Sequence, residues 1–325
     1  MKSTNTINSM NPINPINSIN TKYFLLTIDV EDWFQVENFK PWIPFTSWDE
    51  RELRVEKNVH RLLDLFDSIK LETNQTTNSI NPINPTNTPK ATFFVLAWLA
   101  ERLPHLVREI KARGHEVASH GYNHELPHSL SAKDLKNDLI DSKKLLEDII
   151  GKAITGYRAP SFAINDDILQ TIADCGYDYD SSYNSFSLHG RYGTISLNGS
   201  GNKGIAHRIK DNFHELPVSN LQLGGLSFPL GGGGYFRLIP YLPFKYGVKS
   251  ILEKGNAYLF FMHPWEIDPD QPRVGSANLN FKFRHYKNLN KTYSRLRDLM
   301  ADFNYCKFVT CADYLNALTG LGLKE

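Results

Sequence analysis

Hydrophobic residues recur along this chain in two patterns, and these patterns predict its secondary structure. Short, almost continuous apolar runs are typical of buried strands, whereas apolar residues spaced three and four positions apart are typical of amphipathic helices. The runs predict strands at 23–26, 91–96, 115–120, 258–263 and 307–309. The helical spacing predicts helices at about 54–70, 103–110, 131–150, 165–176 and 287–303. Because strands and helices alternate, the chain is predicted to have an α/β fold with a parallel sheet or barrel.

Two stretches lack either pattern. Residues 5–20 and 78–88 repeat Ile-Asn-Pro and Ile-Asn-Ser units, and proline, asparagine and serine at this density do not pack into a core. We therefore expect a disordered low-complexity tail at 1–21 and a single domain at 22–325, with a low-complexity loop insertion at 72–90.

Ionisable residues fall repeatedly at the carboxyl ends of the predicted strands. They are Asp29, His120, Arg158 and His263. In α/β barrels this rim carries the active site, so we predict that the four side chains meet there. A glycine run at 231–234 has no Lys-Ser/Thr ending and no preceding strand, which argues against a phosphate loop and favours a mobile loop at the rim.

A metal site is predicted from two histidines and one acid. His120 and His124 are four residues apart and can converge on one cation if the backbone turns between them, and imidazole nitrogen suits zinc and related divalent metals. With one carboxylate they form a set that is typical of hydrolytic metal sites. On an ideal strand Glu31 shares a face with Asp29, whereas a bulge at the strand end would favour Asp32. We take Asp32, His120 and His124 as the expected ligands and keep Glu31 as the alternative carboxylate.

The composition narrows the function classes. The 325 residues carry a formal net charge of +1, which gives no electrostatic basis for binding nucleic acid. The cysteines Cys175, Cys306 and Cys311 lack metal-ligand spacing and indicate reduced thiols. No apolar run is long enough for a transmembrane helix, and the N-terminus lacks the apolar core of a signal peptide. We therefore expect a cytoplasmic protein, which could act close to the inner membrane.

Four motifs in one order resemble a known family. They are Asp29 to Asp32, Ser119-His120-Gly121-Tyr122-Asn123-His124, Arg158-Ala159-Pro160-Ser161-Phe162 and Leu259-Phe260-Phe261-Met262-His263. They are similar to the motifs of the NodB-homology polysaccharide deacetylases, which are carbohydrate esterases, and the likeness covers most of residues 23–315. The tail from Phe261 to Asp268, with Gln271-Pro272-Arg273 and Phe283-Arg284-His285-Tyr286, looks like the branch found at exopolysaccharide loci with exosortase-type sorting systems.

The resemblance implies a fold, a substrate class and a cofactor. The fold would be a distorted (β/α) barrel of about seven parallel strands, with residues 264–325 as a family-specific extension packed on it. The implied activity removes N-acetyl groups from amino sugars of an exopolysaccharide or its precursor. The expected partner is therefore an N-acetylated oligo- or polysaccharide, which could be lipid-linked. The expected cofactor is a divalent metal, with Zn²⁺ favoured and Co²⁺, Ni²⁺ or Fe²⁺ as alternatives.

The resemblance also implies that Asp29 is the general base. Arg158 is its natural partner, because an arginine holds a neighbouring carboxylate charged and oriented. His263 can protonate the departing nitrogen, since imidazole titrates close to neutral pH. In this family the oxyanion meets a backbone N–H that follows the proline-rich turn, which here begins at Pro160 and makes Ser161 or Phe162 the expected donor.

Other residues have weaker assignments. Asp180 lies in a segment that resembles the family's fourth motif, where it would shape the pocket wall or orient a histidine. Trp265 and Tyr235 are candidates for stacking on a sugar ring, although core packing explains an aromatic residue equally well. His207, His214 and His285 show no supporting pattern and are interpreted as structural or surface residues.

Two other functions fit the same residues. A related branch of the fold hydrolyses cyclic amides or imides, in some cases without a metal, and the presence of both His120 and His124 argues against the metal-free version. A non-catalytic glycan-binding member of the fold would be indicated by the loss of a ligand, and every recognisable position is retained. A screen of small ring amides separates the first alternative, and glycan binding without acetate release would identify the second.

Overall fold

The structure, a computed structural model, describes residues 21–72, 88–186, 192–197 and 202–320. The predicted tail at 1–21 and the predicted loop insertion at 72–90 lie almost entirely outside these ranges.

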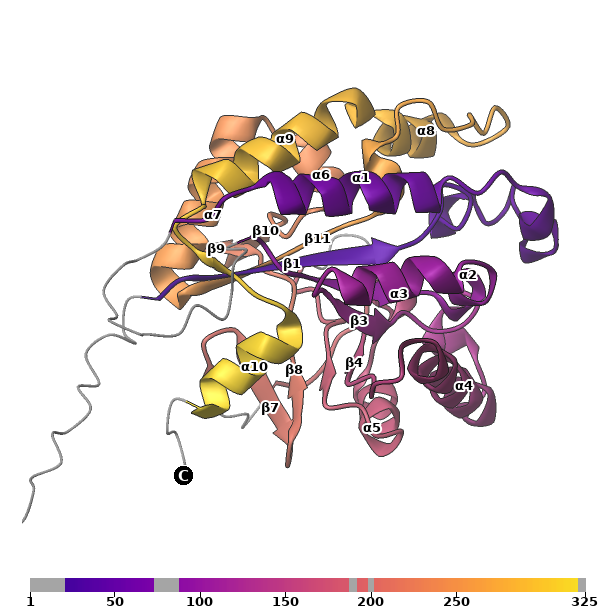
Figure 1. The fold of residues 1–325 in the computed structure, drawn as a ribbon, viewed down its shortest axis with the longest axis horizontal. Coiled ribbons are helices and arrows are strands. Elements are labelled where there is room, and N and C mark those ends of the chain that lie inside the picture. The colour runs from indigo at the N-terminus through magenta and orange to yellow at the C-terminus, as the bar shows by residue number, and fades with distance from the viewer. Residues whose placement is uncertain (1–20, 73–87, 187–191, 198–201, 321–325) are drawn as a thin grey trace, which may run out of the picture.

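A curved sheet forms the centre of the molecule (Figure 1). In the described chain it has ten strands in the order β11-β1-β2-β3-β4-β5-β8-β7-β6, with β12 paired beside the start of β1. From β11 through β8 every neighbouring pair is parallel, which makes seven parallel strands and confirms the predicted distorted barrel. The strands are β1 (Tyr23–Val30), β2 (Ala91–Val95), β3 (Glu116–Ser119), β4 (Gly156–Tyr157), β5 (Tyr179–Asp180), β6 (Asn202–Lys203), β7 (Ala206–Lys210), β8 (Phe213–Glu215), β11 (Ala257–Met262) and β12 (Lys307–Phe308).

Loop backbone, rather than strand pairing, connects β8 to β11 among the described residues. The Ser219 N–H donates to Leu259 O (3.3 Å), and the Phe261 N–H donates to Gly231 O (2.8 Å). Gly232 has a φ of 120°, and a Cβ at this position would lie 2.0 Å from the Phe261 carbonyl oxygen. The glycine run is therefore a packed seam of the barrel, not the mobile rim loop that the sequence predicts. A separate hairpin of β9 (Leu221–Leu223) and β10 (Leu226–Phe228) lies between the two halves of this seam.

Helices cover the outside of the sheet. Figure 1 shows α1, α6, α7 and α9 along one side of β1, and α4, α5 and α10 on the opposite side. No helix in the described ranges is both long and apolar enough to cross a membrane. The helices are α1 (Val55–Ser68), α2 (Ala97–Arg102), α3 (Pro104–Ala112), α4 (Ala132–Ile150), α5 (Asp166–Asp174), α6 (Gly233–Leu238), α7 (Tyr241–Gly255), α8 (Leu279–Tyr286), α9 (Leu289–Asp302) and α10 (Cys311–Gly320).

Local signals explain where two of these helices begin. The Ser131 side chain accepts the Asp134 N–H at the start of α4, and Asn165 Oδ1 accepts the Ile168 N–H at the start of α5. Such capping satisfies an N–H that has no partner within the helix. These caps place the two helix starts at the positions where the sequence predicts helices, 131–150 and 165–176.

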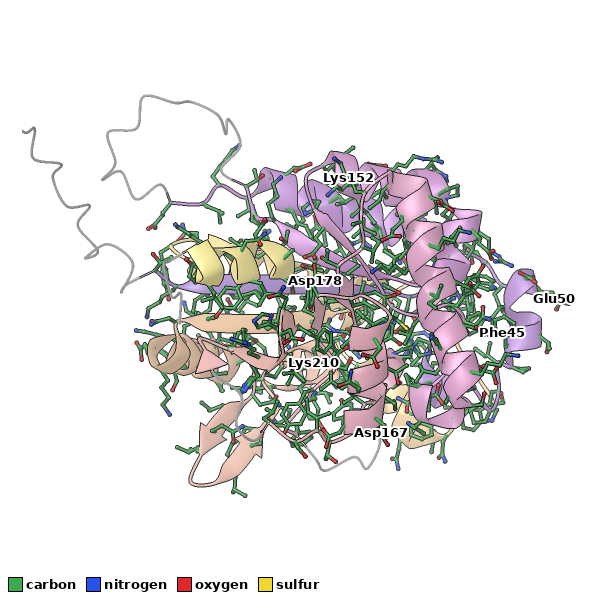
Figure 2. The ribbon with its side chains drawn as sticks, turned by 90° about the horizontal axis from the view of Figure 1, so that it is seen from below. Phe45, Glu50, Lys152, Asp167, Asp178 and Lys210 are labelled. Atoms are coloured by element: carbon green, nitrogen blue, oxygen red, sulfur yellow. The ribbon has the colours of Figure 1, made fainter. Side chains whose placement is uncertain are left out.

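The carboxyl ends of the parallel strands meet at one end of the barrel. The segment after β1, which contains η2 (Glu37–Phe39) and η3 (Phe45–Glu50), projects beyond this end, where Figure 2 labels Phe45 and Glu50. The 3₁₀ helix η6 (Pro264–Ile267) follows β11, and α8 lies at the same end in Figure 1. This rim holds the side chains described next.

Candidate active site

Glu31, His120 and His124 form a buried cluster at the rim. They lie just beyond β1 and β3, and each is less than 5% exposed. The Nε2 atoms of both histidines lie 3.0 Å from Glu31 Oε1, and one ligand atom of each residue lies within 4.8 Å of the other two. In tetrahedral zinc sites, with bonds of about 2.0–2.1 Å, ligand atoms are roughly 3.3 Å apart. The donor set and its spacing therefore fit a divalent metal.

The backbone fixes the orientation of both imidazoles. His120 Nδ1 donates to the carbonyl oxygen of Arg158 (2.8 Å), so Nε2 is the nitrogen that faces Glu31. His124 has a positive φ of 56°, which is rare for a residue with a side chain and is found at functional sites. The turn that Gly121 begins thus returns the second histidine to the same point as the first.

The electrostatics of Glu31 favour its charged form. Burial opposes ionisation, but His124 and His263 nearby, with hydrogen bonds from His120 and His124, outweigh it and hold the pKa of Glu31 well below its usual range. A carboxylate that stays ionised between two histidines is the form that binds a cation.

Asp32, which was the expected carboxylate ligand, points away from the histidines. Its Oδ2 accepts the N–H groups of Arg54 (2.6 Å) and Val55 (2.8 Å), and its Oδ1 accepts the N–H of Trp33 (2.8 Å). Asp32 thus holds the start of α1, where N–H groups have no partner within the helix. Of the two carboxylates left open by the sequence, the structure brings Glu31 to the cluster, on the face that it shares with Asp29.

Asp29 lies beside the cluster and is bound by Arg158. The Arg158 Nη1 donates to Asp29 Oδ1 and to Thr27 Oγ1, both at 2.7 Å. Its Nε and Nη2 donate to the carbonyl oxygen (2.9 Å) and hydroxyl (2.8 Å) of Ser181. The guanidinium is fully buried, and its carbon lies 4.1 Å from the centre of the Phe94 ring. The contacts with Thr27, Ser181 and Phe94 hold the guanidinium in place, and the guanidinium in turn orients Asp29.

His263 faces the cluster from β11. Its Nε2 lies 3.8 Å from Glu31 Oε1 and 3.9 Å from Asp29 Oδ2, while its Nδ1 lies 2.9 Å from Glu266 Oε1. Burial opposes a charge on this imidazole, but Glu31, Glu266 and Asp29 outweigh it and raise the pKa of His263 to about 9. A cation bound by Glu31 would offset part of this effect. The predicted set of Asp29, Arg158, His120 and His263 is thus brought together at one rim.

A cavity of about 150 Å³ opens over these residues. Ser161 and Phe162 line it, and both have positive φ values, 54° and 57°. The Phe162 N–H donates to Ala159 O (3.0 Å) and is therefore used within this turn. Of the two predicted oxyanion donors, this leaves the N–H of Ser161 as the better candidate. Pro160 sets the turn without lining the cavity.

Asp180 and Trp265 differ from their assignments. Asp180 is not in the cavity wall and contacts no histidine; its carboxylate accepts the Ser182 hydroxyl (2.7 Å) and N–H (3.0 Å) and lies against Glu215. Trp265 borders the cavity, but its ring is stacked with His263 and His285. The residue is only 5% exposed, so little of the ring is open to a sugar. Tyr235 packs against Phe186 and does not line the cavity.

Sequence reasoning missed several residues at this site. Glu37, Arg237 and His285 line the cavity, although the sequence interprets His285 as structural or surface; Arg284, which belongs to the tail motif, lines it too. These residues come from η2, α6 and α8 and lie outside the four ordered motifs. The charged pattern Phe283 to Tyr286 is the one signal in the chain that points to this wall.

The family comparisons divide the chain into two parts. Residues 56–179 match the family described as polysaccharide deacetylase, and residues 181–313 match a domain of unknown function, DUF3473. The chain therefore contains a polysaccharide deacetylase domain of the NodB-homology type, which confirms the resemblance carried by the motifs. Glu31 precedes the first match, and His263 lies within the second.

Curated relatives point the same way. A peptidoglycan-N-acetylglucosamine deacetylase of Bacillus cereus is 34% identical over 88 residues, which are 27% of this chain and 41% of that protein. A peptidoglycan deacetylase of Helicobacter pylori is 35% identical over 99 residues, which are 30% of this chain and 34% of that protein. The chain thus spans less than half the length of either relative. A Mycobacterium smegmatis structure, solved as a candidate polysaccharide deacetylase, shares the fold, with a TM-score of 0.60, 18% identity and 97% of each chain covered.

Proposed function

We propose that the protein is a metal-dependent hydrolase that removes N-acetyl groups from the amino sugars of a polysaccharide. The observation that carries this proposal is the Glu31, His120 and His124 cluster, with Asp29 and His263 beside it. An acetamide needs a base for water, a stabilised oxyanion and an acid for the leaving nitrogen. This rim offers a candidate for each.

Glu31, His120 and His124 are the residues that would hold the metal. A divalent cation bound there supplies Lewis acidity, which polarises a carbonyl group and makes water more acidic. Zinc is the favoured ion, because two imidazoles and one carboxylate match its usual catalytic ligands, although cobalt, nickel and iron accept the same set.

The remaining roles fall to this chain's own side chains. Asp29, oriented by Arg158, is placed to take a proton from the attacking water. His263, whose Nε2 faces the cluster, is placed to give a proton to the leaving nitrogen. The N–H of Ser161 at the cavity wall is the proposed backbone donor to the oxyanion.

The substrate class rests on the relatives and on the tail. Relatives are named for peptidoglycan and, in Sinorhizobium fredii, for chitooligosaccharide deacetylation, so an N-acetylated glycan is the common feature. The tail motifs around Phe261 to Asp268 resemble the exopolysaccharide branch, which favours an exopolysaccharide or its lipid-linked precursor. The names of the relatives thus support cleavage of an N-acetyl group, and the tail favours one polymer class.

The test is acetate release from N-acetylglucosamine oligomers by metal-stripped protein, before and after reloading with zinc. We expect zinc to restore release and His120→Ala to lower it by at least about 1,000-fold, since a lost ligand removes the cation's contribution. His128→Ala is the matched control, because His128 is an exposed histidine four residues beyond His124. Equal activity with and without metal, or in the His120 variant, would overturn the proposal. Hydrolysis of a small ring amide in place of the oligomers would favour the cyclic-amide alternative.

A further inference from the structure

A buried chain of hydrogen bonds lies behind His263. Arg237 Nε donates to Glu266 Oε2 (2.6 Å), and His263 Nδ1 lies 2.9 Å from Glu266 Oε1. Arg237 Nη1 also donates to the carbonyl oxygens of His285 (2.7 Å) and Lys287 (2.9 Å). Arg237 and Glu266 are 2% and 1% exposed, so this ion pair lies in the interior. Removal of one partner would leave the other charge buried and unpaired, which is strongly destabilising.

Glu266 holds the backbone as well as the ring of His263. Its Oε1 accepts the His263 N–H (3.1 Å) in addition to facing Nδ1, and its own N–H donates to His263 O (3.1 Å). Both the main chain and the imidazole are therefore fixed by one carboxylate. Burial opposes its charge, but Arg237 and His263 outweigh burial and lower the pKa of Glu266. An ionised carboxylate can only accept, so the proton in the contact is on Nδ1.

An aromatic stack limits the remaining movement of His263. Its ring lies 5.2 Å from Trp265 at an interplanar angle of 20°, and Trp265 lies 4.1 Å from His285 at 14°. The outer ring is held in turn, since His285 Nε2 lies 2.7 Å from Gln271 Oε1 and the Gln271 amide donates to Trp265 O (2.8 Å). The stack thus prevents rotation of the His263 ring, while Glu266 selects the nitrogen that points at the cluster.

These residues share one origin in the chain. Arg237, His263, Trp265, Glu266 and His285 all lie in residues 181–313, the part that matches a domain of unknown function. They come from α6, β11, η6 and α8, which meet only in the folded protein. The fourth-motif residue Asp180, which was a candidate for orienting a histidine, contacts Ser182 and Glu215 instead.

We infer that Glu266, held by Arg237, is a positioning residue that keeps the Nδ1 proton of His263 in place and directs Nε2 toward the reacting group. This inference rests on the proposed deacetylation. In that step the Nε2–H bond breaks and an N–H bond forms on the departing nitrogen, which receives the electron pair of the C–N bond. His263 is left neutral with its proton on Nδ1, in contact with Glu266. On this reading, residues 181–313 supply the acid of the reaction and the groups that orient it.

Two substrates with different leaving groups separate this role from a structural one. An N-acetylglucosamine oligomer loses an amine, which needs a proton, whereas 4-nitrophenyl acetate loses a stable phenolate, which needs none. Zinc-loaded wild type, Glu266→Gln and Glu266→Ala are compared on both, with bound zinc measured in each sample. We expect kcat on the oligomer to fall about tenfold in E266Q and at least about 100-fold in E266A, and the ester rate to change less than about threefold. The partial rescue arises because a glutamine oxygen still accepts from Nδ1.

Glu116→Gln is the control for loss of a half-buried, hydrogen-bonded carboxylate away from the site. Glu116 lies at the opposite end of β3 from His120 and accepts hydrogen bonds from Thr92 and Tyr179. We expect it to leave the ratio of amide to ester rates unchanged. Equal losses of kcat on both substrates in E266Q, or no loss on the oligomer, would overturn the positioning role. If E266A does not fold, the comparison of E266Q with wild type decides the question. Wild-type protein that is inactive on both substrates would overturn the proposed function itself and the positioning role with it.

Discussion

At the scale of single residues, Glu31 and Asp32 are adjacent acids in different environments. The Glu31 N–H donates to Asp29 O (2.9 Å), which turns the chain as β1 ends and leaves the Glu31 carboxylate over the two histidines. The next residue then points the other way, and Asp32 accepts three backbone N–H groups at the start of α1. One acid is available to a cation, and the other stabilises a helix end.

The two acids should therefore respond differently to substitution. We expect Glu31→Gln to reduce zinc affinity by at least about 100-fold, because it removes the charged ligand. Asp32→Asn should leave zinc affinity within a few-fold of wild type but lower the free energy of unfolding by about 1–3 kcal/mol, since its amide NH₂ cannot accept these N–H groups. Isothermal titration with zinc and urea unfolding check both. Loss of zinc by D32N with retention by E31Q would identify Asp32 as the ligand.

A second pair of acids gives a prediction about pH. Glu215 and Asp180 lie against each other in the interior, where burial and their mutual repulsion raise the pKa of Glu215 well above its usual value. The folded protein therefore keeps a proton that the unfolded chain releases. Since the folded state binds more protons, its stability falls as pH rises above the usual glutamate pKa of about 4.3, by up to about 1.4 kcal/mol per pH unit.

Glu215→Gln should remove this loss of stability at higher pH. A glutamine can donate from its amide to Asp180 while its oxygen accepts the Tyr183 N–H, as Glu215 Oε1 does at 2.9 Å. We expect the difference in Tm between E215Q and wild type to move in favour of the variant as pH increases from 5 to 8, on the order of several degrees for 1–2 kcal/mol. Thermal unfolding at four pH values checks the trend. A constant difference across that range would contradict the shared proton.

At the scale of elements, the seam between the glycine run and β11 depends on the absence of a side chain. A Cβ at Gly232 would lie 2.0 Å from the carbonyl oxygen of Phe261, at a φ that side chains rarely adopt. We expect Gly232→Ala to lower the free energy of unfolding by roughly 2 kcal/mol or more. Gly255→Ala is the control, because it ends α7 with nothing within 4 Å of its added Cβ, and it should be neutral or slightly stabilising. Equal stability of the two variants in urea unfolding would show that the seam can shift to accommodate a Cβ at position 232.

Elements with strong periodicity could be predicted, and elements made by tertiary contacts could not. β1, β2, β11, α4 and α5 carry complete apolar patterns or caps, so their residues alone indicate them. The short α2 follows β2 closely and its first four residues are apolar, so no helical period distinguishes it from a continuation of the strand. The strands from β6 to β10 have two to five residues, and β7 to β10 include exposed or half-buried positions, which leaves little pattern.

The same distinction holds for the candidate site. Asp29, His120, Arg158 and His263 each lie at or just after the end of a strand, so the topology alone brings them to one rim. The choice between Glu31 and Asp32 depends on the turn after β1, which periodicity does not describe. Arg237 and Glu266 are 29 residues apart and meet only through packing, so no local pattern announces their contact.

At the scale of the whole molecule, the two family matches contribute strands to one sheet. Although the matches divide near residue 180, β8 from the second part pairs with β5, and β11 pairs with β1 over six residues. The second part also covers the rim with η6 and α8, so each part lacks a complete core alone. Interfaces of this kind make unfolding cooperative, because one part exposes the buried strands of the other when it opens.

We therefore expect a single unfolding transition, and the tryptophans allow this to be measured. Trp33, Trp42, Trp48 and Trp98 belong to the first part of the chain, and Trp265 belongs to the second. In Trp265→Phe, the remaining tryptophans report on the first part alone. The difference in fluorescence between wild type and this variant reports on residue 265. Phenylalanine is chosen because it keeps an aromatic ring beside His263 and His285. Midpoints in urea should coincide for fluorescence and far-ultraviolet circular dichroism within each protein. Two separated midpoints would mean that residues 181–313 open on their own, and the acid side of the proposed active site would then be a detachable module.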